Sequence, residues 1–580
     1  MTNSKIKFKP ISQKVRAIVN EHGGQSKDVL EILVALQTEN GALMRETLDE
    51  VARSLEIPPA KVYGVASFYS MLEVAQAVPA STTSKIRVCD GPVCWLCDGD
   101  IKSVGDSVRK THPDSKVERT SCLGLCDRAP AALVGDEQVG PIQAEKINDI
   151  SVDEIRKPVD YKVPRPGEVR VMLANAGIID PDSLESALSM GAYEGLQAAL
   201  KLSPEDVIDV VEQSNLNGRG GAGFPVGRKW RYVASASRIP KFVICNADES
   251  EPLIFKDRVL IETNPQQILE GMAIAGYATG ANTGFIYIRG EYSNQAQRLE
   301  RGIEQAEKKG WLGDNIAGSG FSFRVHVHRG AGAYICGEET ALIESLEGKR
   351  GEPRVRPPYP PTSGYLNLPT LVNNVESFAA VPSILQRGAA WYKNLSNNPA
   401  GGTKLYMVLG HVNHPGLFEA PFGLTLRQIM DDFGGGLRTG SKFHFALCGG
   451  AAGTIVDKSL LDTPIDYTSA EKGISLGAGA FLVCDERVSP VAMLRELMHF
   501  FSVESCGKCT PCRGGTTRSY KLLTRIADGH GENGDIQELV TLAEVMQAAS
   551  FCGLGQSVNL PVKSALAHFG EIFEAGIMRS

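Results

Sequence analysis

The chain has 580 residues, of which 43% are hydrophobic and 22% are charged, and its formal net charge at pH 7 is −7. One hydrophobic core cannot serve a chain of this length, so we expect three to five domains. The mildly acidic balance argues against a nucleic-acid partner, which needs a basic surface. The sequence has no run of eighteen apolar residues, so we expect no membrane span.

Cysteine usage indicates the compartment. The N-terminal segment MTNSKIKFKP lacks the apolar stretch of a secretory signal, and most of the 13 cysteines lie in close clusters. Such clusters in a chain without a signal are typical of metal sites in a reducing compartment, so we expect a cytoplasmic protein.

In the N-terminal third, the spacing of apolar residues changes once, from a helical pattern to a mixture of strand and helix patterns. Apolar residues at helical spacing predict a helical bundle over residues 1–80, with helices in residues 11–23, 28–41, 45–58 and 59–73. Residues 81–160 alternate short strands with helices, which is typical of a thioredoxin-sized α/β domain. Its strands are predicted in residues 85–89, 115–122 and 131–136, and its helices in residues 101–111 and 140–150. Linkers are predicted in residues 77–85 and 157–168.

Three further parts follow along the chain. Residues 161–398 predict a larger α/β domain with strands at 241–247, 283–290 and 323–330. Residues 399–485 are β-rich, and residues 486–580 return to helical periodicity.

The strongest chemical signal lies near the C-terminus. Cys506, Cys509 and Cys512 are spaced C-x2-C-x2-C, and Cys552 follows later in the chain. Three thiolates on one tight loop can bind three corners of a cubane, and a distant fourth completes the site. Zinc sites more often use two separated CxxC pairs. The spacing therefore favours a 4Fe–4S cluster over a zinc site or structural cysteines.

A second group contains five cysteines. Cys89 and Cys94 form a C-x4-C pair, and Cys122 and Cys126 form a C-x3-C pair. Two pairs on two loops suit a 2Fe–2S cluster, in which each iron takes two thiolates. The alternatives are a zinc site and a redox dithiol of Cys94 and Cys97, and spacing alone does not exclude Cys97 as a cluster ligand.

A glycine-rich segment, NGRGGAGFPVGRKW, contains G-x-G-x-x-G at Gly218, Gly220 and Gly223. An amphipathic helix precedes it instead of a strand, so the context of a Rossmann site is missing. Phe224 offers a face for a flat ring. The flanking basic residues that suit a phosphate are Arg219, Arg228 and Lys229. The segment predicts a nucleotide or flavin phosphate site; the alternative is a surface loop.

Acidic residues follow two predicted strands. In CNADESEP, a strand ends in crowded acids, which indicates a site more often than a solvated turn. They are Asp248, Glu249, Glu251 and, after a gap, Asp257. In GAGAYICGEET, a glycine-rich turn leads into a helix that starts near Glu338. Glu338 and Glu339 either contact ligand hydroxyls or a cationic ring, or they complement the helix N-terminus.

These motifs, together with VNNVES and ESCGKCTPC, resemble those of the NADH-oxidising flavoprotein of respiratory complex I. The N-terminal part resembles the small 2Fe–2S subunit of that complex. The resemblance covers residues 10–580. Both parts in one chain, without an appended ferredoxin-like domain, are most similar to the large diaphorase subunit of soluble NAD-reducing nickel–iron hydrogenases.

The resemblance implies a multidomain α/β fold. In chain order it comprises a helical bundle (1–80), a thioredoxin-like 2Fe–2S domain (81–160), an FMN- and NAD(H)-binding α/β domain (161–398), a ubiquitin-like β-grasp domain (399–485) and a helical domain with a 4Fe–4S cluster (486–580).

The resemblance also implies which residues bind each cofactor. The implied 2Fe–2S ligands, which leave Cys97 over, are Cys89, Cys94, Cys122 and Cys126. The implied 4Fe–4S ligands are Cys506, Cys509, Cys512 and Cys552. The implied FMN contacts are Gly218, Arg219, Gly220, Lys229, Asn246, Asp248, Asn373 and Asn374. The implied NAD(H) contacts are Phe224, Glu251, Glu338 and Glu339. Further cofactor-binding residues are Gly223, Glu249, Tyr334, Gly337 and Tyr359.

The implied reaction is hydride exchange between NAD(H) and FMN, followed by single-electron steps through the clusters. Glu251 is the predicted catalytic residue, because a carboxylate beside the flavin disfavours negative charge on its reduced form. The implied partners are an iron–sulfur electron-transfer subunit and a nickel–iron hydrogenase pair. Alternatives are the same module in complex I or in a NAD-dependent formate dehydrogenase, a relay subunit without flavin, and a zinc-stabilised nucleotide-binding regulator.

Overall fold

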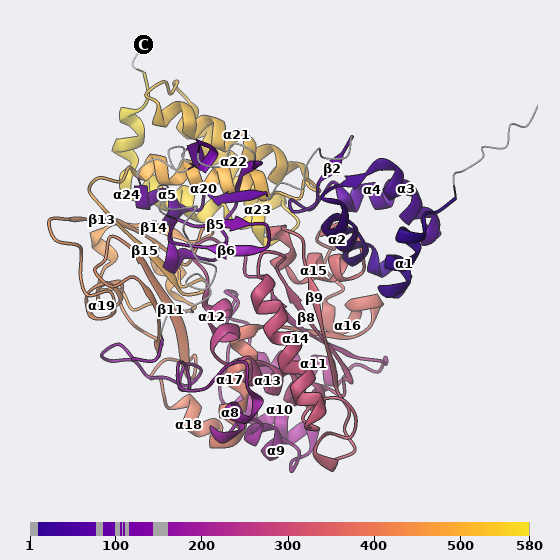
Figure 1. Cartoon of the computed structure of the whole chain (residues 1–580). Helices are drawn as coiled ribbons and strands as arrows, with labels where there is room; N and C mark the ends of the chain where they lie inside the picture. The colour runs from indigo at the N-terminus through magenta and orange to yellow at the C-terminus, as the bar shows by residue number, and fades with distance from the viewer. Residues whose placement is uncertain are drawn as a thin grey trace, which may run out of the picture.

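The computed structural model describes residues 10–76, 85–98, 105–106, 108–110, 115–142 and 161–578. The predicted linker over residues 77–85 and the predicted helices over residues 101–111 and 140–150 lie largely outside these residues. Figure 1 shows the N-terminal helices on one side, the large α/β region below and the C-terminal helices at the top.

The four predicted N-terminal helices form, but the third ends at Ser54 and the fourth at Ala66, earlier than predicted. Ser12 caps its first helix by accepting the Val15 N–H at 3.4 Å, and Gly41 ends the second in a left-handed conformation. The helices are α1 (Gln13–Glu21), α2 (Val29–Asn40), α3 (Arg45–Ser54) and α4 (Pro59–Ala66). The strands β1 (Leu43–Met44) and β2 (Val74–Ala75), too short to show a period, pair in parallel.

The second part is a four-stranded sheet in the order β4-β3-β5-β6. Its elements are β3 (Ile86–Cys89), α5 (Pro92–Asp98), β4 (Val117–Thr120), β5 (Ala132–Val134) and β6 (Glu137–Val139). Strand β3 pairs in parallel with β4 and antiparallel with β5, as expected of a thioredoxin-like domain. The parallel register places Cys89 opposite Thr120, so both cysteine pairs start from one edge of this sheet.

The third part is built on a parallel sheet in the order β10-β7-β8-β9. The strands are β7 (Phe242–Ala247), β8 (Thr283–Ile288), β9 (Arg324–Arg329) and β10 (Thr370–Asn374). Strand β10 was not predicted, because its apolar run is short and ends in two asparagines. The register sets Asn373 opposite Cys245 and Asn374 opposite Asn246. The carboxyl ends of β7 and β10 therefore meet at the edge where parallel α/β sheets bind ligands.

Helices surround this sheet (Figure 1). They are α8 (Leu184–Ser189), α9 (Glu194–Ala199), α10 (Pro204–Gln213), α11 (Val226–Ala234), α12 (Lys256–Thr263), α13 (Pro265–Thr279), α14 (Ser293–Lys308), α15 (Glu339–Leu346), α16 (Pro360–Ser363), α17 (Val375–Arg387) and α18 (Ala389–Lys393).

The fourth part is a five-stranded mixed sheet with its own hydrophobic core. Its strands are β11 (Thr403–Gly410), β12 (Gly416–Pro421), β13 (Phe443–Cys448), β14 (Thr454–Val456) and β15 (Ala480–Asp485), with α19 (Leu426–Gln428) between β12 and β13. The strand order is β12-β11-β15-β13-β14. The first and last strands along the chain, β11 and β15, therefore lie side by side and parallel, as the expected β-grasp arrangement requires.

The C-terminal part is a helical bundle. It consists of α20 (Pro490–Glu504), α21 (Thr510–Ala527), α22 (Asp535–Ala549), α23 (Gly553–Ser557) and α24 (Asn559–Ala575). Helix α5 of the thioredoxin-like domain packs against both α20 and β11, so that domain contacts the bundle and the mixed sheet. Across the described ranges, no helix is both long and apolar enough to cross a membrane.

The packing of α13 against α17 yields a stability prediction. A Cβ atom on Gly271 would lie 2.1 Å from the Phe378 carbonyl oxygen, so Gly271→Ala must push the two helices apart. We expect a loss of about 1–3 kcal/mol and a lower unfolding temperature by calorimetry. In the matched control Gly570→Ala, the new Cβ meets open space, and stability should be unchanged or higher. Equal unfolding temperatures for the two variants would contradict this packing.

Candidate functional site

A cavity of about 450 Å³ opens at the carboxyl ends of β7 and β10. The glycine-rich segment, the loop after β7, the turn before α15, loops of the mixed sheet and the start of α23 all contribute to its wall. The residues that line it are Gly220, Gly221, Ala222, Asn246, Asp248, Glu249, Ser250, Glu251, Ile254, Lys256, Asp257, Tyr334, Ile335, Gly337, Glu338, Asn374, Gly449, Ala452, Ser475, Gly477, Ala478, Gly553, Leu554 and Ser557.

The cavity brings together nine of the predicted site residues. They are Gly220, Asn246, Asp248, Glu249, Glu251, Tyr334, Gly337, Glu338 and Asn374. They come from four separate stretches of chain, and a hydrogen bond joins two of these: the Asn246 side-chain amide donates to the Gly337 carbonyl at 2.8 Å. The strand end and the glycine-rich turn, separate motifs in the sequence, therefore form one wall.

The floor of the cavity is a buried polar network. Lys256 Nζ donates to Asp257 at 2.6 Å and to Asn374 Oδ1 at 2.8 Å, and the Asn374 amide donates to Asp257 Oδ2 at 2.6 Å. Glu376, which is fully buried, lies 3.2 Å from Lys256 and 3.1 Å from Lys404. This network fixes the Asn374 side chain at the cavity.

Burial favours the protonated, neutral form of three carboxyl groups in the cavity wall. Burial raises the pKa of Asp248 to about 7 and that of Glu249 to about 8, and it also raises the pKa of Glu251. Glu251 accepts hydrogen bonds from the Tyr334 hydroxyl and, at 2.9 Å, from the Ala452 N–H. An anionic ligand therefore meets less repulsion here than the number of acids suggests.

Glu338 complements the helix N-terminus, as one of its two interpretations predicts, and it also faces the cavity. Its carboxylate accepts the N–H groups of Thr340 and Ala341 at 2.9 Å each, so it caps α15. It also lines the cavity. Arg356 lies 3.5 Å from Glu338 and 3.7 Å from Glu339, which places a guanidinium beside these acids.

The remaining predicted cofactor residues do not line the cavity. The Arg219 guanidinium is buried elsewhere: it donates to Tyr392 Oη at 3.1 Å and to the Gly401 carbonyl at 2.9 Å, and it stacks over Phe422. Phe224 and Tyr359 are surface aromatics with 42% and 55% of their area exposed.

The other five, which include Glu339, lie behind or beside the wall. Lys229 Nζ contacts Glu339 at 3.2 Å and the Val372 carbonyl at 3.1 Å. Asn373 accepts the indole N–H of Trp230 at 3.1 Å. The remaining two are glycines that pack on Tyr467 of the mixed-sheet region: Gly218 and Gly223.

The C-terminal cysteines converge beside the cavity. Cys506 and Cys509 occupy the loop between α20 and α21, Cys512 lies in the first turn of α21, and Cys552 caps α23. Burial raises the pKa of Cys512 to about 11 and that of Cys552 to about 12, with the neighbouring thiols adding to both shifts. Because Cys552 directly precedes α23, and α23 lines the cavity, the thiol site and the cavity share a wall.

Four of the five N-terminal cysteines also meet. Cys122 and Cys126 are 3.5 Å apart between sulfurs, and hydrogen bonds with Cys122 and Cys94 raise the pKa of Cys89. These four side chains are buried, whereas Cys97 is exposed. The four predicted ligands therefore lie together and are buried, and Cys97 differs from them in being exposed to solvent.

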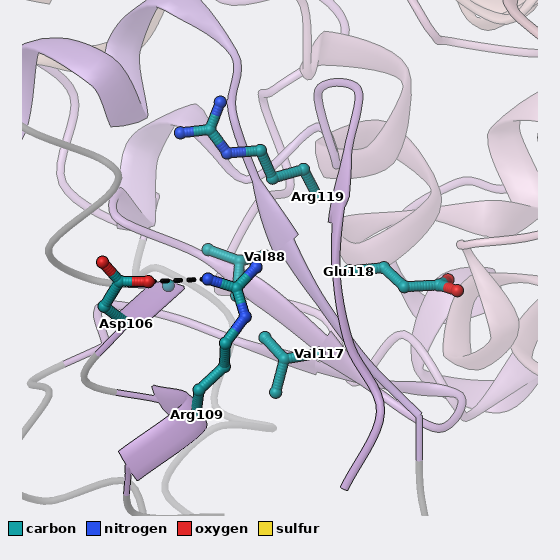
Figure 2. Close-up of a pocket in the computed structure, with 7 residues that line it drawn as sticks. Val88, Asp106, Arg109, Val117, Glu118 and Arg119 are labelled. Carbon is teal, nitrogen blue, oxygen red and sulfur yellow. Dashed lines mark hydrogen bonds and ion pairs between the residues drawn. The ribbon is translucent and has the colours of Figure 1, made fainter.

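Among the described residues, no group of three or more His, Cys, Asp or Glu side chains is arranged to hold one metal ion. A second cavity, about 250 Å³, lies on the thioredoxin-like domain (Figure 2). It contains none of the predicted site residues, and an Arg109–Asp106 ion pair of 2.7 Å crosses it. Its lining residues are Val88, Gly105, Asp106, Arg109, Val117, Glu118 and Arg119.

Sequence reasoning missed several residues that hold the site together. Lys256 and Glu376 form the floor network, and Glu504 accepts hydrogen bonds from the Ser121 hydroxyl and, at 3.0 Å, from the Tyr334 N–H. No local pattern marks these contacts, since each joins residues far apart in the chain. The only available signal was position, because Glu504 stands two residues before Cys506.

Three family models match the chain. The model described as the Nuo51 FMN-binding domain matches residues 211–383, and the iron–sulfur binding region of NADH-ubiquinone oxidoreductase F matches residues 492–576. The thioredoxin-like 2Fe–2S ferredoxin model matches residues 15–155. The chain therefore has an FMN-binding domain, a C-terminal 4Fe–4S region and a 2Fe–2S domain, as the sequence analysis predicted.

The chain is similar to curated proteins and solved structures. It is 44% identical over 409 residues to the F 2 subunit of the NADH-quinone oxidoreductase of Rhizobium meliloti, covering 70% of this chain and 97% of that protein. It is 43% identical over 412 residues to the HndC subunit of the NADP-reducing hydrogenase of Solidesulfovibrio fructosivorans, covering 71% and 84%. A chain of the NAD+-reducing NiFe-hydrogenase in the H2-reduced state superposes with a TM-score of 0.82 at 33% identity, covering 95% and 94%.

The cavity fits a flavin with a hydroxylated chain. Among the described residues, Asp248 Oδ2 is a buried polar atom without a hydrogen-bond partner, and it belongs to a cavity-lining side chain. A buried polar atom of this kind needs a partner, which a ligand hydroxyl supplies. The thiol sets fit iron–sulfur clusters, since each offers four cysteines.

The exposure of Cys97, in contrast to the four buried thiols, yields a prediction. Cys97→Ser should keep the 2Fe–2S cluster, because four buried thiols remain, whereas Cys94→Ser should lose it or alter it strongly. Electron paramagnetic resonance (EPR) of the two reduced variants measures this. A lost signal in Cys97→Ser together with a normal signal in Cys94→Ser would reverse the ligand assignment.

Proposed function

We propose that this chain, which belongs to the family of the F subunits of NADH-quinone oxidoreductases, is a diaphorase subunit that exchanges hydride between NAD(H) and FMN. Single electrons then pass through its 4Fe–4S and 2Fe–2S clusters. The observation that carries the proposal is the shared wall: the cavity at the ends of β7 and β10 is lined by α23, which Cys552 caps.

Bound FMN supplies the conversion that the reaction needs, because a hydride carries two electrons and an iron–sulfur cluster accepts one. The chain's own residues bind and orient. Asn246 and Asn374 stand at neighbouring strand ends with their amides fixed by hydrogen bonds, and we assign them to the flavin. Asp248 offers its unpartnered oxygen to a ligand hydroxyl.

Glu251 is assigned a position beside the reacting rings. The Tyr334 hydroxyl and the Ala452 N–H hold its carboxyl group at the cavity wall. Loops of the mixed sheet and α23 close the cavity on this side, which reduces access of water and oxygen. We assign NAD(H) to the same opening, with Glu338, Glu339 and Phe224 as its contacts.

The proposed complex is a NAD-reducing hydrogenase, in which hydrogen and NAD+ give NADH and a proton. It is supported by coverage, since the hydrogenase chain matches 95% of this chain and the F 2 subunit of Rhizobium meliloti matches 70%. The partners would be an iron–sulfur electron-transfer subunit and a nickel–iron pair, in the cytoplasm. The second candidate is the same module in complex I or a formate dehydrogenase, favoured by the 44% identity to an F-type protein of NADH-quinone oxidoreductase.

Purification of the native complex tests both the diaphorase function and the identity of the complex. Flavin absorbance that NADH bleaches under anaerobic conditions, with iron and sulfide bound to the chain, supports the diaphorase; a chain with zinc and no flavin refutes it. Nickel-containing subunits and hydrogen-dependent NAD+ reduction in the same complex support the hydrogenase. A quinone-reducing or formate-oxidising complex without nickel would favour the second candidate.

The C-terminal cluster is expected to carry electrons away from the flavin and not to serve its reduction. In Cys509→Ser, NADH should still bleach the flavin, because no cavity-lining residue has changed. Reduction of the natural partner should fall at least tenfold. Rapid-mixing absorbance and partner turnover measure the two steps, and normal partner turnover without the 4Fe–4S signal would refute this role.

The charge of Glu251 is expected to lower the flavin potential. In Glu251→Gln, one carboxylate is removed from the wall, and relief of about 1–2 kcal/mol corresponds to roughly 20–40 mV for a two-electron couple. Burial raises the pKa of Glu251, so the wild-type group is neutral below that pKa and charged above it. The potential of Glu251→Gln should therefore exceed that of wild type increasingly as pH rises. Redox titration at several pH values measures this, and a pH-independent or negative difference would leave Glu251 as a positional contact.

A further inference from the structure

Two buried arginines of the α/β region lie under the loop that carries the second cysteine pair. We call residues 122–127 the 2Fe–2S loop. Arg258 of α12 and Arg289, which follows β8, have 0% and 3% of their surface exposed. Neither lines the cavity, and neither belongs to a motif used above.

Arg289 touches both cofactor sites. Its Nη2 donates to the Cys122 carbonyl at 2.7 Å, and its Nη1 donates to the Glu249 carbonyl at 2.6 Å. Cys122 is an assigned cluster ligand, and Glu249 lines the cavity. The same guanidinium pairs with Glu291 at 2.9 Å, so its charge is balanced inside the protein. One side chain therefore links the backbone of a cluster ligand to the wall of the flavin cavity.

Arg258 holds the rest of the loop. Its Nε donates to the Gly124 carbonyl at 3.0 Å, and its Nη2 donates to Asp127 at 2.5 Å. Its Nη1 pairs with Glu262 at 2.9 Å. Each guanidinium thus donates to a loop carbonyl and keeps a carboxylate partner.

The loop also fits closely against Tyr292. Gly124 has a φ of +69°, and a Cβ there would lie 1.9 Å from the Tyr292 hydroxyl oxygen. That hydroxyl donates to Glu249 Oε2 at 3.1 Å. The loop therefore rests on the three side chains of Arg258, Arg289 and Tyr292, of which two also contact Glu249.

We propose that Arg289, assisted by Arg258, is a positioning residue that seats the 2Fe–2S loop on the wall of the flavin cavity and raises the reduction potential of the 2Fe–2S cluster. This inference rests on the proposed function, because it needs the assigned 2Fe–2S ligands. Reduction adds one electron to the cluster, and no bond forms or breaks at Arg289. N–H groups and positive charge next to a site that gains an electron stabilise its reduced form.

The ion pair of Arg289 and Glu291 determines the sign of the expected shift in the 2Fe–2S reduction potential. Without Arg289, the buried carboxylate of Glu291 would lose its ion-pair partner, and its negative charge near the cluster site would be far less compensated. Reduction of the cluster should then become harder. Without Glu291, the guanidinium would be uncompensated, and reduction should become easier. A merely structural role for the pair predicts no such opposite shifts.

The experiment is an EPR-monitored potentiometric titration of the 2Fe–2S signal in the native complex. For Arg289→Gln we expect a tenfold lower ratio of reduced to oxidised cluster at a given potential, which is about 59 mV for a one-electron couple. Glu291→Gln should shift the potential upward. Arg289→Gln with Glu291→Gln should return it towards wild type, and Arg289→Lys should fall between wild type and Arg289→Gln, since it keeps the charge but not the forked geometry.

The matched control is Arg525→Gln, which removes an arginine from an ion pair with Asp535 in the C-terminal bundle and should leave the 2Fe–2S potential unchanged. If Arg289→Gln does not retain its cluster, Arg289→Lys and Glu291→Gln decide by the signs of their shifts. Unchanged potentials in both Arg289→Lys and Glu291→Gln, or a double variant as low as Arg289→Gln alone, would overturn the inference. A wild-type complex without a 2Fe–2S signal would instead refute the proposed function.

Discussion

One carboxylate, Glu504, sets the mutual position of the three sites. It accepts the hydroxyl of Ser121, which precedes Cys122, and the N–H of Tyr334 at 3.0 Å. Glu504 itself ends α20 and stands two residues before Cys506. Tyr334 in turn holds Glu251. Both cysteine loops and the cavity wall are therefore tied to one side chain, and leaving its donors unsatisfied would cost about 1–3 kcal/mol each.

The same constraint explains which parts of the site could be predicted from the sequence. Cysteine spacing, strand-end acids and the glycine-rich turn are local patterns, and the structure gathers most of them around one cavity. Strand β10 was missed, because two apolar residues before two asparagines show no period. The side chain of Arg219 was expected at the flavin, yet it is buried against Phe422, since flanking position in a sequence does not fix the direction of a side chain.

The connecting residues could not be predicted for a different reason. Lys256, Arg258, Arg289 and Glu504 contact partners that are separated from them by more than a hundred positions. No propensity or spacing rule reports such pairs, and a charged residue in a sequence is most often solvated. Only the fold reveals that these charges are buried and paired.

The thioredoxin-like domain depends on this docking. Its own apolar clusters are small, and they contain Cys89 and Cys94, whereas Cys122 and Cys126 pack into the main core that extends through the α/β region. The assigned 2Fe–2S site thus lies between two cores. Buried ion pairs such as Arg258–Asp127 add little net stability after desolvation, but they penalise any misplaced docking strongly. These charges therefore contribute more to the specific placement of the cluster site than to stability. Because one chain carries both domains, the two residues of each ion pair stay together.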